Sequence, residues 1–411
     1  MKLLRNPVRP YAWGSRTAIA GLLGHPTPSP HPQAELWIGA HPTDPSSLVS
    51  GNGSAASLLD VLRADPVGQL GTARARRWGP RLPFLLKVLA ADEPLSLQAH
   101  PSAEQAARGF AMEQAAGIPV DAPERNYKDP DPKPELICAL TEFHALAGFR
   151  PAARSVELLA ALDVEPLAPY VELLAAEPGP DGLRALFTTW ITLPQSALAQ
   201  LRPHLLDACV RHIRARGEFV RECRTTLQLA EHYPEDAGVL ASLLLNHLVL
   251  RPTEAVFLPA GNLHTYLHGT GVEILANSDN VLRGGLTPKH VDVPELLKVL
   301  DFGDAGVPVL TGEPVCEHQT VYRTPADEFQ LSRLDWAAGR SEEVTLPGGR
   351  PQILLCTDGG AELTAADGQA LGLPRGSSVW LPACDPPVLI RPVPGLAGSC
   401  RVFRATTGDG D

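Results

Sequence analysis

The stretch PAGNLH at residues 259–264 directly follows the apolar run AVFL at residues 255–258, and together they decide how this chain folds. The apolar run predicts a buried strand, and the proline and glycine after it predict a tight turn. Gly261 supplies a backbone conformation that other residues avoid. His264 would then begin the next strand with its side chain pointing into the protein interior. The alternative interpretation is a hairpin whose histidine belongs only to the core.

Short apolar segments broken by turn residues lie on both sides of this stretch. Residues 84–90 (FLLKVLA) predict a buried strand, and residues 95–100 (LSLQAH) alternate at period 2 until Pro101. Glycine and proline number 36 and 41 among 411 residues, so the chain turns often. Many short strands between such turns favour a β-sandwich or a jelly roll. The strand, turn and histidine at 255–264 resemble the second metal motif of the cupin jelly rolls.

A helical texture separates two β-rich regions. Residues 151–250 are rich in alanine, leucine, glutamate and arginine, and the apolar residues Leu183, Leu186, Phe187 and Trp190 share one helical face. A further helix is expected from Leu158 onward, and another over residues 239–250, ended by Arg251-Pro252. We therefore interpret this region as a helical insertion.

The fold prediction is a mainly β protein with two β domains. A cupin-type jelly-roll catalytic domain is expected from residues 1–150 and 251–320, with the α-helical insertion at 151–250 between them. A linker is expected near residues 310–325. Residues 321–411, with strands at 352–357, 361–364 and 377–381, are expected to form a degenerate cupin domain. Residues 375–384 (RGSSVWLPAC) contain a cupin-like strand and turn without a following histidine, so no metal is expected there.

Composition excludes several classes of function. The net charge of −11 argues against a general nucleic-acid binder, although a few local cations can still hold one phosphate. No apolar run approaches the roughly 20 residues of a membrane span, and the first residues lack the apolar stretch of a signal peptide. The seven cysteines are scattered and form no Cys-x-x-Cys pair, which predicts reduced thiols in a cytoplasmic protein.

Polar side chains at period 2 define two further motifs. Gln98 and His100 face the same side of one expected strand, and Lys133 and Glu135 share a face just before another apolar strand. A carboxylate facing the interior of a jelly roll is costly unless it is paired or ligated. The flanking Asp129 and Asp131 are interpreted as part of an exposed, proline-stiffened loop.

Residues 271–289 form the last motif. Glu273, Asp279, Arg283 and Lys289 lie among apolar and glycine residues, whereas surface charge runs usually lack such interleaving. The Gly-Gly pair after Arg283 lets the backbone approach a ligand closely.

Taken together, these motifs resemble the type I phosphomannose isomerases of the cupin superfamily. The resemblance extends from residue 6 to about 302, in family order and with family-like spacing. It rests on residues 11–15 (YAWGS), 35–39 (ELWIG), 95–101 (LSLQAHP), 133–135 (KPE), 259–264 (PAGNLH) and 278–283 (SDNVLR).

The resemblance implies roles for individual residues. It implies one Zn²⁺ held by Gln98, His100, Glu135 and His264. It places Arg283 and Lys133 at the reaction site, with Glu273, Asp279 and Tyr266 nearby. It places Ser96, Lys87 and Lys289 at the substrate phosphate. The chain departs from the family at Asp131-Pro132, where Asn-His is more usual, so any role of that histidine in proton transfer is open here.

The implied activity interconverts mannose 6-phosphate and fructose 6-phosphate through a cis-enediol, feeding mannose metabolism and GDP-mannose synthesis. The enzyme is expected to be a cytoplasmic monomer whose partner is a small sugar phosphate, with no nucleic-acid or membrane partner. Three residues are candidates for the base, and the sequence does not rank them: Glu273, Asp279 and Lys133.

Two other functions compete with this interpretation. A cupin-fold metal-dependent dioxygenase would usually carry His-x-His instead of Gln-x-His. A non-catalytic, sugar-phosphate-binding bicupin would be expected to lack metal ligands. Histidines without a spaced partner are expected at the surface or in caps: His25, His31, His41, His204, His212, His232 and His318. Structural roles are expected for His144, His247, His268 and His290.

Overall fold

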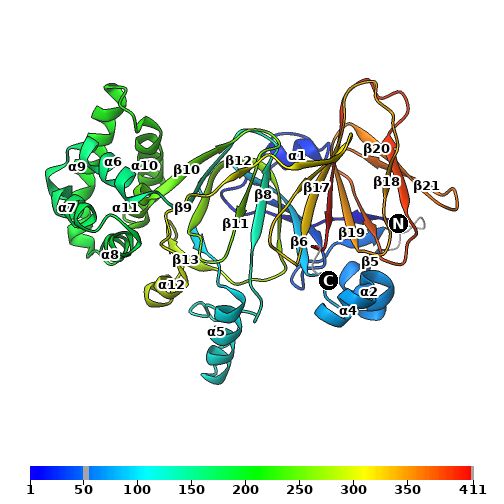
Figure 1. Cartoon of the computed structure of the whole chain (residues 1–411), viewed down its shortest axis with the longest axis horizontal. Coiled ribbons are helices and arrows are strands. Elements are labelled where there is room, and N and C mark those ends of the chain that lie inside the picture. The colour runs from blue at the N-terminus through cyan, green and yellow to red at the C-terminus, as the bar shows by residue number, and fades with distance from the viewer. Residues whose placement is uncertain (50–54, 409–411) are drawn as a thin grey trace.

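The computed structural model describes residues 1–49 and 55–408. Figure 1 shows an elongated molecule with a block of helices at one end, a first β-sheet in the middle and further sheets at the other end. No helix in the described ranges is both long and apolar enough to cross a membrane.

The first sheet has eleven strands and is built around one long strand. That strand, β12 (His264–Ala276), pairs antiparallel with β6 (Phe84–Ala91) and β8 (Glu135–Ala139) along its second half, and with β7 (Leu97–Ala99) and β9 (Phe143–Phe149) near its start. The remaining strands are β2 (Val8–Arg9), β3 (Glu35–Gly39), β10 (Leu245–Leu250), β11 (Ala255–Leu258), β13 (Leu282–Gly285) and β14 (Val309–Leu310). This pairing brings the start of β12 beside β7, where the predicted metal motifs meet.

The turn before β12 needs its glycine. Gly261 has a φ of +79°, in the left-handed region that other residues rarely adopt. A Cβ at this position would also lie 3.0 Å from both the Asp301 backbone nitrogen and the Val299 carbonyl oxygen. The turn therefore fixes where His264 begins the strand.

A second sheet of nine strands and a third of four form the other end of the molecule. The nine-stranded sheet contains β1 (Lys2–Arg5), β4 (Ser47–Val49), β5 (Ala55–Ser57), β15 (Glu313–Cys316), β16 (Gln319–Tyr322), β17 (Gln330–Trp336), β19 (Gln352–Asp358), β22 (Ser378–Leu381) and β24 (Cys400–Thr406). The four-stranded sheet contains β18 (Val344–Leu346), β20 (Gly360–Ala365), β21 (Ala370–Pro374) and β23 (Val388–Pro392). The strands expected at 352–357, 361–364 and 377–381 are thereby confirmed, to within a residue at each end.

Two features of this end differ from expectation. The stretch near 310–325 is not a plain linker, because β15 and β16 pair with each other and β16 continues into the sheet through β17. The N-terminal β1 lies in the second sheet, between β22 and β4. The domain boundaries remain predictions, but this pairing couples the start of the chain to its C-terminal region.

Six α-helices lie between β9 and β10: α6 (Ala152–Leu162), α7 (Ala168–Ala176), α8 (Pro180–Ile191), α9 (Gln195–Arg214), α10 (Val220–His232) and α11 (Gly238–Ala241), together with the 3₁₀ turns η1 (Glu165–Leu167) and η2 (Ser242–Leu244). The expected face of α8 is confirmed, because Leu183, Leu186, Phe187 and Trp190 are all buried. The helix expected over 239–250 is wrong beyond η2. Residues Leu245–Leu250 pair with β9, because that edge offers the backbone hydrogen bonds that complete the sheet.

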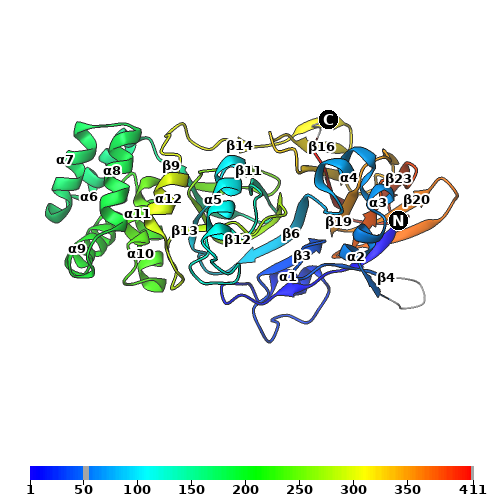
Figure 2. The same ribbon diagram turned by 90° about the horizontal axis from the view of Figure 1, so that it is seen from below.

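The remaining helices are short or lie at the edges. They are α1 (Ala18–Leu22), α2 (Leu58–Ala64), α3 (Pro66–Leu70), α4 (Thr72–Trp78), α5 (Ala103–Ala115) and α12 (Val293–Val299). A capping box of Ser102 and Gln105 begins α5, which projects from the first sheet (Figures 1 and 2).

Candidate active site

A cavity of about 560 Å³ opens on the first sheet and collects the predicted site residues. Its walls come from β3, β6, β7, β12 and β13 and from the loops before β8 and after β12. The lining includes every site residue predicted from the sequence except His100: Lys87, Ser96, Gln98, Lys133, Glu135, His264, Tyr266, Glu273, Asp279, Arg283 and Lys289. His100 lies directly behind this lining, against Glu135.

Three of the four predicted metal ligands converge at the base of the cavity. His100 Nε2 lies 3.3 Å from Glu135 Oε1, and His264 Nε2 lies 3.5 Å from Glu135 Oε2. Ligand atoms of the three side chains all fall within 4.8 Å of one another. All three side chains are buried, with residue exposures of 1% for His100 and 4% for the other two. The fourth predicted ligand, Gln98, is the register partner of His264 across β7 and β12.

Hydrogen bonds orient each of these donors. His100 Nδ1 lies 2.8 Å from the backbone carbonyl oxygen of Asn280. His264 Nδ1 lies 3.0 Å from the backbone carbonyl oxygen of Asn262. Because a carbonyl only accepts, each Nδ1 carries the proton and each Nε2 presents a lone pair. The side-chain nitrogen of Gln98, Nε2, donates a hydrogen bond to Ser96 Oγ at 3.2 Å. The side-chain oxygen, Oε1, is then the atom that can coordinate a metal. Such supporting contacts are typical of metal sites.

The charges around these ligands, at the base of the cavity, fit a divalent cation. Burial alone would raise the pKa of Glu135, but His100 and Lys133 outweigh it and lower that pKa well below the ordinary value. Within the described chain, His100 Nε2 is buried and has no hydrogen-bond partner. A buried nitrogen without a partner is costly unless a ligand binds it. Two imidazoles, one carboxylate and an amide oxygen therefore match a zinc site with one negative charge among its donors.

A second cluster of charges forms one wall of the cavity. Lys87 Nζ lies 3.3 Å from both Glu35 Oε1 and Glu273 Oε2. Burial lowers the pKa of Lys87, but the two carboxylates outweigh it and raise that pKa above its ordinary value. Burial raises the pKa of Glu273, and Lys87 offsets only part of this effect. Trp37 donates to Glu35 Oε2 at 2.7 Å, so it fixes the far side of the cluster.

The sequence interpretation gave Glu35 and Trp37 no role of their own. The signal was present, because residues 35–39 (ELWIG) lie on one strand where positions 35 and 37 share a face. The register adds what the sequence lacks: Trp37 is the partner of Lys87, and Lys87 is the partner of Glu273 across β6 and β12. Lys87 is therefore already neutralised by carboxylates, which does not favour a phosphate ligand.

The cavity is also lined by three cations whose charged groups have no hydrogen-bond or ion-pair partner among the described residues: Lys128, Arg283 and Lys289. Arg283, on β13, is the register partner of Gln98 on β7, and burial lowers its pKa. Its guanidinium makes no hydrogen bond or ion pair with the residues that the structure describes. Burial also lowers the pKa of Lys289, and the nearby charges of Arg283 and Lys128 lower it further. Lys128 is a cavity residue that the sequence interpretation did not single out.

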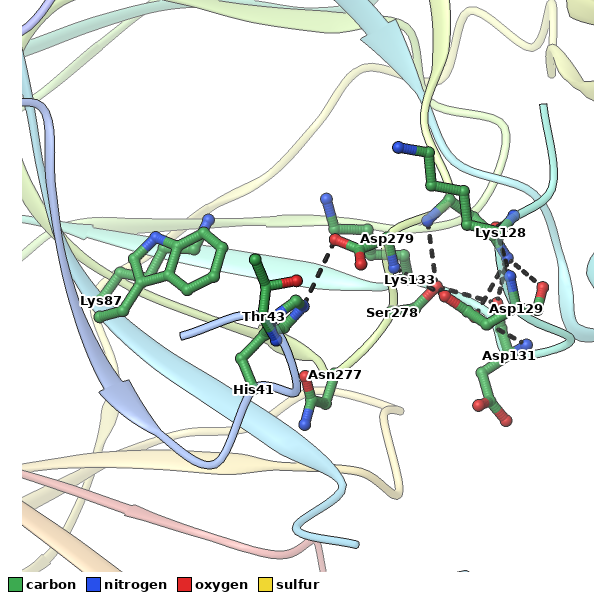
Figure 3. Close-up of polar contacts among 12 residues, drawn as sticks. His41, Thr43, Lys87, Lys128, Asp129, Asp131, Lys133, Asn277, Ser278 and Asp279 are labelled. Carbon is green, nitrogen blue, oxygen red and sulfur yellow. Dashed lines mark hydrogen bonds and ion pairs between the residues drawn. The ribbon is translucent and has the colours of Figure 1, made fainter. Parts of the chain in front are cut away.

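The loop before β8 is not the exposed, charged loop that was expected. Asp129 is half-buried and accepts hydrogen bonds from Ser278 Oγ at 2.7 Å and from the Asp279 backbone nitrogen at 2.8 Å (Figure 3). Asp131 pairs with Arg81 at 2.7 Å and accepts through its carbonyl from Asn280. Pro132, at the departure from the family pattern, lines a separate cavity of about 40 Å³.

The expectation for His41 is also corrected. His41 is neither a surface nor a cap residue: it is 4% exposed and lines the main cavity. Its Nε2 lies 3.3 Å from Asp279 Oδ1 (Figure 3). The two residues are far apart along the chain, so no spacing rule could pair them.

Replacing Asn280 with alanine is expected to lower metal affinity about tenfold and to destabilise the fold by about 2 kcal/mol. Asn280 is fully buried. Its side-chain amide accepts a hydrogen bond from the Lys128 backbone nitrogen and donates to the backbone carbonyls of Asp129 and Asp131. Its backbone carbonyl orients His100. Zinc titration and thermal unfolding measure the two effects. Asn277→Ala is the matched control, and equal effects from both variants would contradict this role for Asn280.

Comparison with known proteins gives a consistent result. A family model described as the catalytic domain of type I phosphomannose isomerase matches residues 1–152. The mannose-6-phosphate isomerase of Escherichia coli (strain K12) is 41% identical over 399 residues, which cover 95% of this chain and 97% of that protein. Mannose-6-phosphate isomerase 1 of Arabidopsis thaliana is 30% identical, over 93% and 89% of the two chains.

Solved structures agree over the whole chain. A mannose 6-phosphate isomerase from Salmonella typhimurium, bound to its substrate fructose 6-phosphate and to zinc, has a TM-score of 0.87 and 38% sequence identity. The match covers 99% of each chain. A zinc-bound mannose 6-phosphate isomerase matches with a TM-score of 0.87 at 37% identity, over the same shares of both chains.

Proposed function

This chain belongs to the type I phosphomannose isomerases, and from that membership we propose that the cavity on its first sheet interconverts mannose 6-phosphate and fructose 6-phosphate. One observation carries the proposal. His100, Glu135 and His264 meet at the base of a cavity that is also lined by Gln98 and by Arg283, a cation without an ion-pair partner among the described residues. The dioxygenase and the non-catalytic alternatives are set aside, because neither accounts for this donor set together with the family membership.

Gln98, His100, Glu135 and His264 would hold the zinc ion. When bound, zinc acts as a Lewis acid that stabilises negative charge on the substrate oxygens during isomerisation. The role of Arg283 is complementary: its permanent charge faces the cavity and stabilises the oxyanion character of the enediol. Its burial without a protein partner supports this role, because an unpaired buried charge is costly unless a ligand compensates it.

The reaction moves a proton between C1 and C2 of the open-chain sugar through a cis-enediol. We assign the transfer to Glu273, which lines the cavity beside Tyr266 and contacts Lys87 at 3.3 Å. Burial raises the pKa of Glu273 above its ordinary value, which is the direction that suits a carboxylate that accepts and returns a proton. Lys133 lies 3.3 Å from Glu135 Oε1, and we assign it to holding that carboxylate. Tyr266 has a pKa well above its ordinary value because it is buried near Glu273, so it stays a hydroxyl donor.

The phosphate binds where cations are free. We assign it to Lys289 and Ser96, as the family resemblance implies, and add Lys128, whose charge is close enough to lower the pKa of Lys289. Lys87 is reassigned to holding Glu273, because its charge is already balanced by two carboxylates. Binding energy from the phosphate then positions the reacting carbons.

We also propose that the enzyme acts as a cytoplasmic monomer without a nucleic-acid partner and that its product, mannose 6-phosphate, feeds mannose metabolism and GDP-mannose synthesis. The net charge of −11 and the free, scattered cysteines support this setting. Light scattering after size exclusion tests the oligomeric state, and a mass of two or more chains would contradict a monomer.

The zinc-loaded protein is expected to convert mannose 6-phosphate to fructose 6-phosphate in a coupled assay. Fully loaded protein without any conversion would contradict the proposed function. Mannose without its phosphate serves as the comparison substrate, and it is expected to react far more slowly because the phosphate contacts are lost.

Removing the metal is expected to abolish this conversion reversibly. Dialysis against a chelator removes the Lewis acid, and one equivalent of zinc should restore the rate, because the donors remain in place. Metal content by mass spectrometry and the coupled assay follow the two steps together. Unchanged activity in metal-free protein would contradict the zinc assignment.

A further inference from the structure

An imidazole outside the metal set faces a carboxylate across the cavity. His41 lies in the loop after β3, and Asp279 lies in the loop between β12 and β13. His41 Nε2 is 3.3 Å from Asp279 Oδ1, and both side chains line the cavity (Figure 3). The two loops belong to opposite ends of the first domain in sequence, so this contact joins two walls of the site.

The hydrogen bonding of His41 fixes its tautomer. The backbone nitrogen of Thr43 donates to His41 Nδ1 at 3.2 Å, so Nδ1 is an acceptor and the proton of the neutral ring is on Nε2. The atom that carries this proton lies 3.3 Å from Asp279 Oδ1. The ring is also held in place by the edge of Trp37, with ring centroids 4.7 Å apart and an interplanar angle of 68°. His41 is therefore a fixed donor and not a freely rotating surface histidine.

Asp279 is held from its other side as well. Its backbone nitrogen donates to Asp129 Oδ2 at 2.8 Å. Its side chain lines the cavity and is 49% exposed, so the carboxylate is accessible to a ligand although Oδ1 lies 3.3 Å from His41 Nε2. The hydrogen bond from His41 is the largest influence on the pKa of Asp279 and lowers it, with smaller contributions from Lys133 and Lys128. The result is an ionised acceptor with a fixed direction.

We propose that His41 is a positioning residue that aims the carboxylate of Asp279 at a hydroxyl group of the bound sugar. The inference rests on the proposed function, because it takes the sugar phosphate as the ligand of this cavity. His41 does not itself transfer the proton; it keeps Asp279 ionised and oriented, so that a substrate hydroxyl finds an acceptor already in place.

Two isosteric variants separate this role from simple packing. Glutamine places its amide nitrogen close to the position of Nε2, whereas asparagine places its amide near Nδ1. His41→Gln therefore keeps the donor to Asp279, and His41→Asn loses it. We expect KM for mannose 6-phosphate within about twofold of wild type for His41→Gln, and raised about tenfold for His41→Asn, with kcat changed less than KM.

Inorganic phosphate is a probe for the phosphate subsite alone, because it has no sugar hydroxyl that Asp279 could bind. Its inhibition constant is expected to stay unchanged in His41→Asn, because the lost contact does not involve the phosphate subsite. A rise in both KM for mannose 6-phosphate and the inhibition constant for inorganic phosphate would overturn the proposal, because it would indicate general damage to the cavity. Wild-type KM in His41→Asn, or an equal rise in both variants, would overturn it as well.

The Asp279→Asn background completes the test. His41→Asn is expected to have no further effect there, because His41 acts through the carboxylate; additive losses would overturn the proposal. Nitrogen-15 spectra of the histidines should show the Nε2–H tautomer for His41, and an Nδ1–H tautomer would overturn it without reference to activity. Failure of the proposed function is distinct, because wild-type protein would then fail to convert mannose 6-phosphate at all.

Discussion

Replacing His264 with alanine is expected to remove bound zinc and to lower kcat/KM by about a thousandfold. The residue supplies one of two imidazoles at the base of the cavity, and its Nε2 lies 3.5 Å from Glu135. Without it, three donors remain, and the Glu135 carboxylate loses a partner in a buried position. Metal content, the coupled assay and thermal unfolding should all change together.

His268→Ala is the matched control, because His268 lies on the same strand but is exposed. That variant is expected to keep its zinc and its activity. Full activity in metal-depleted His264→Ala protein would contradict the metal assignment, whereas loss of zinc from both variants would point to damage of β12.

Replacing Arg283 with alanine is expected to lower kcat by about 100- to 1,000-fold while the zinc content stays the same. Arg283 lines the cavity and is half-buried. Burial lowers the pKa of its guanidinium. An interaction made mainly in the transition state should affect kcat more than KM. Because removing an unpaired buried charge relieves a cost, the folded state should be as stable as wild type or slightly more stable.

Arg283→Lys tests the geometry of this cation. It keeps the charge but loses the planar, forked donor, so it is expected to recover only part of the lost rate. Loss of zinc from Arg283→Ala would contradict the catalytic role, and Arg283 would then be a structural support for Gln98, its register partner.

Much of the site followed from short-range patterns. Gln98 and His100 share a face because a strand alternates at period 2, and Gly261 places His264 because a tight turn restricts the backbone. These are local constraints, which is why the sequence predicts them. The family resemblance then linked the motifs, and the structure places them around one cavity.

Contacts between distant segments were beyond this reasoning. His41 and Asp279 are separated by more than half of the chain, and the pairing of Glu35 with Lys87 depends on the register of β3 against β6. The sequence predicts helix for Leu245–Leu250, which is a strand, because a short segment rich in leucine and valine fits either structure. Its pairing with β9 decided the outcome.

Short motifs in the amino-acid sequence predict the family and the activity class, and the resemblance that these motifs carry implies the four metal donors. Which charges are paired depends on the folded chain: Lys87 lies between two carboxylates, whereas Arg283 has no ion-pair partner among the described residues. The reason is physical. The free energy of a buried charge depends on what surrounds it in space, and those neighbours come from strands and loops that only the folded chain brings together.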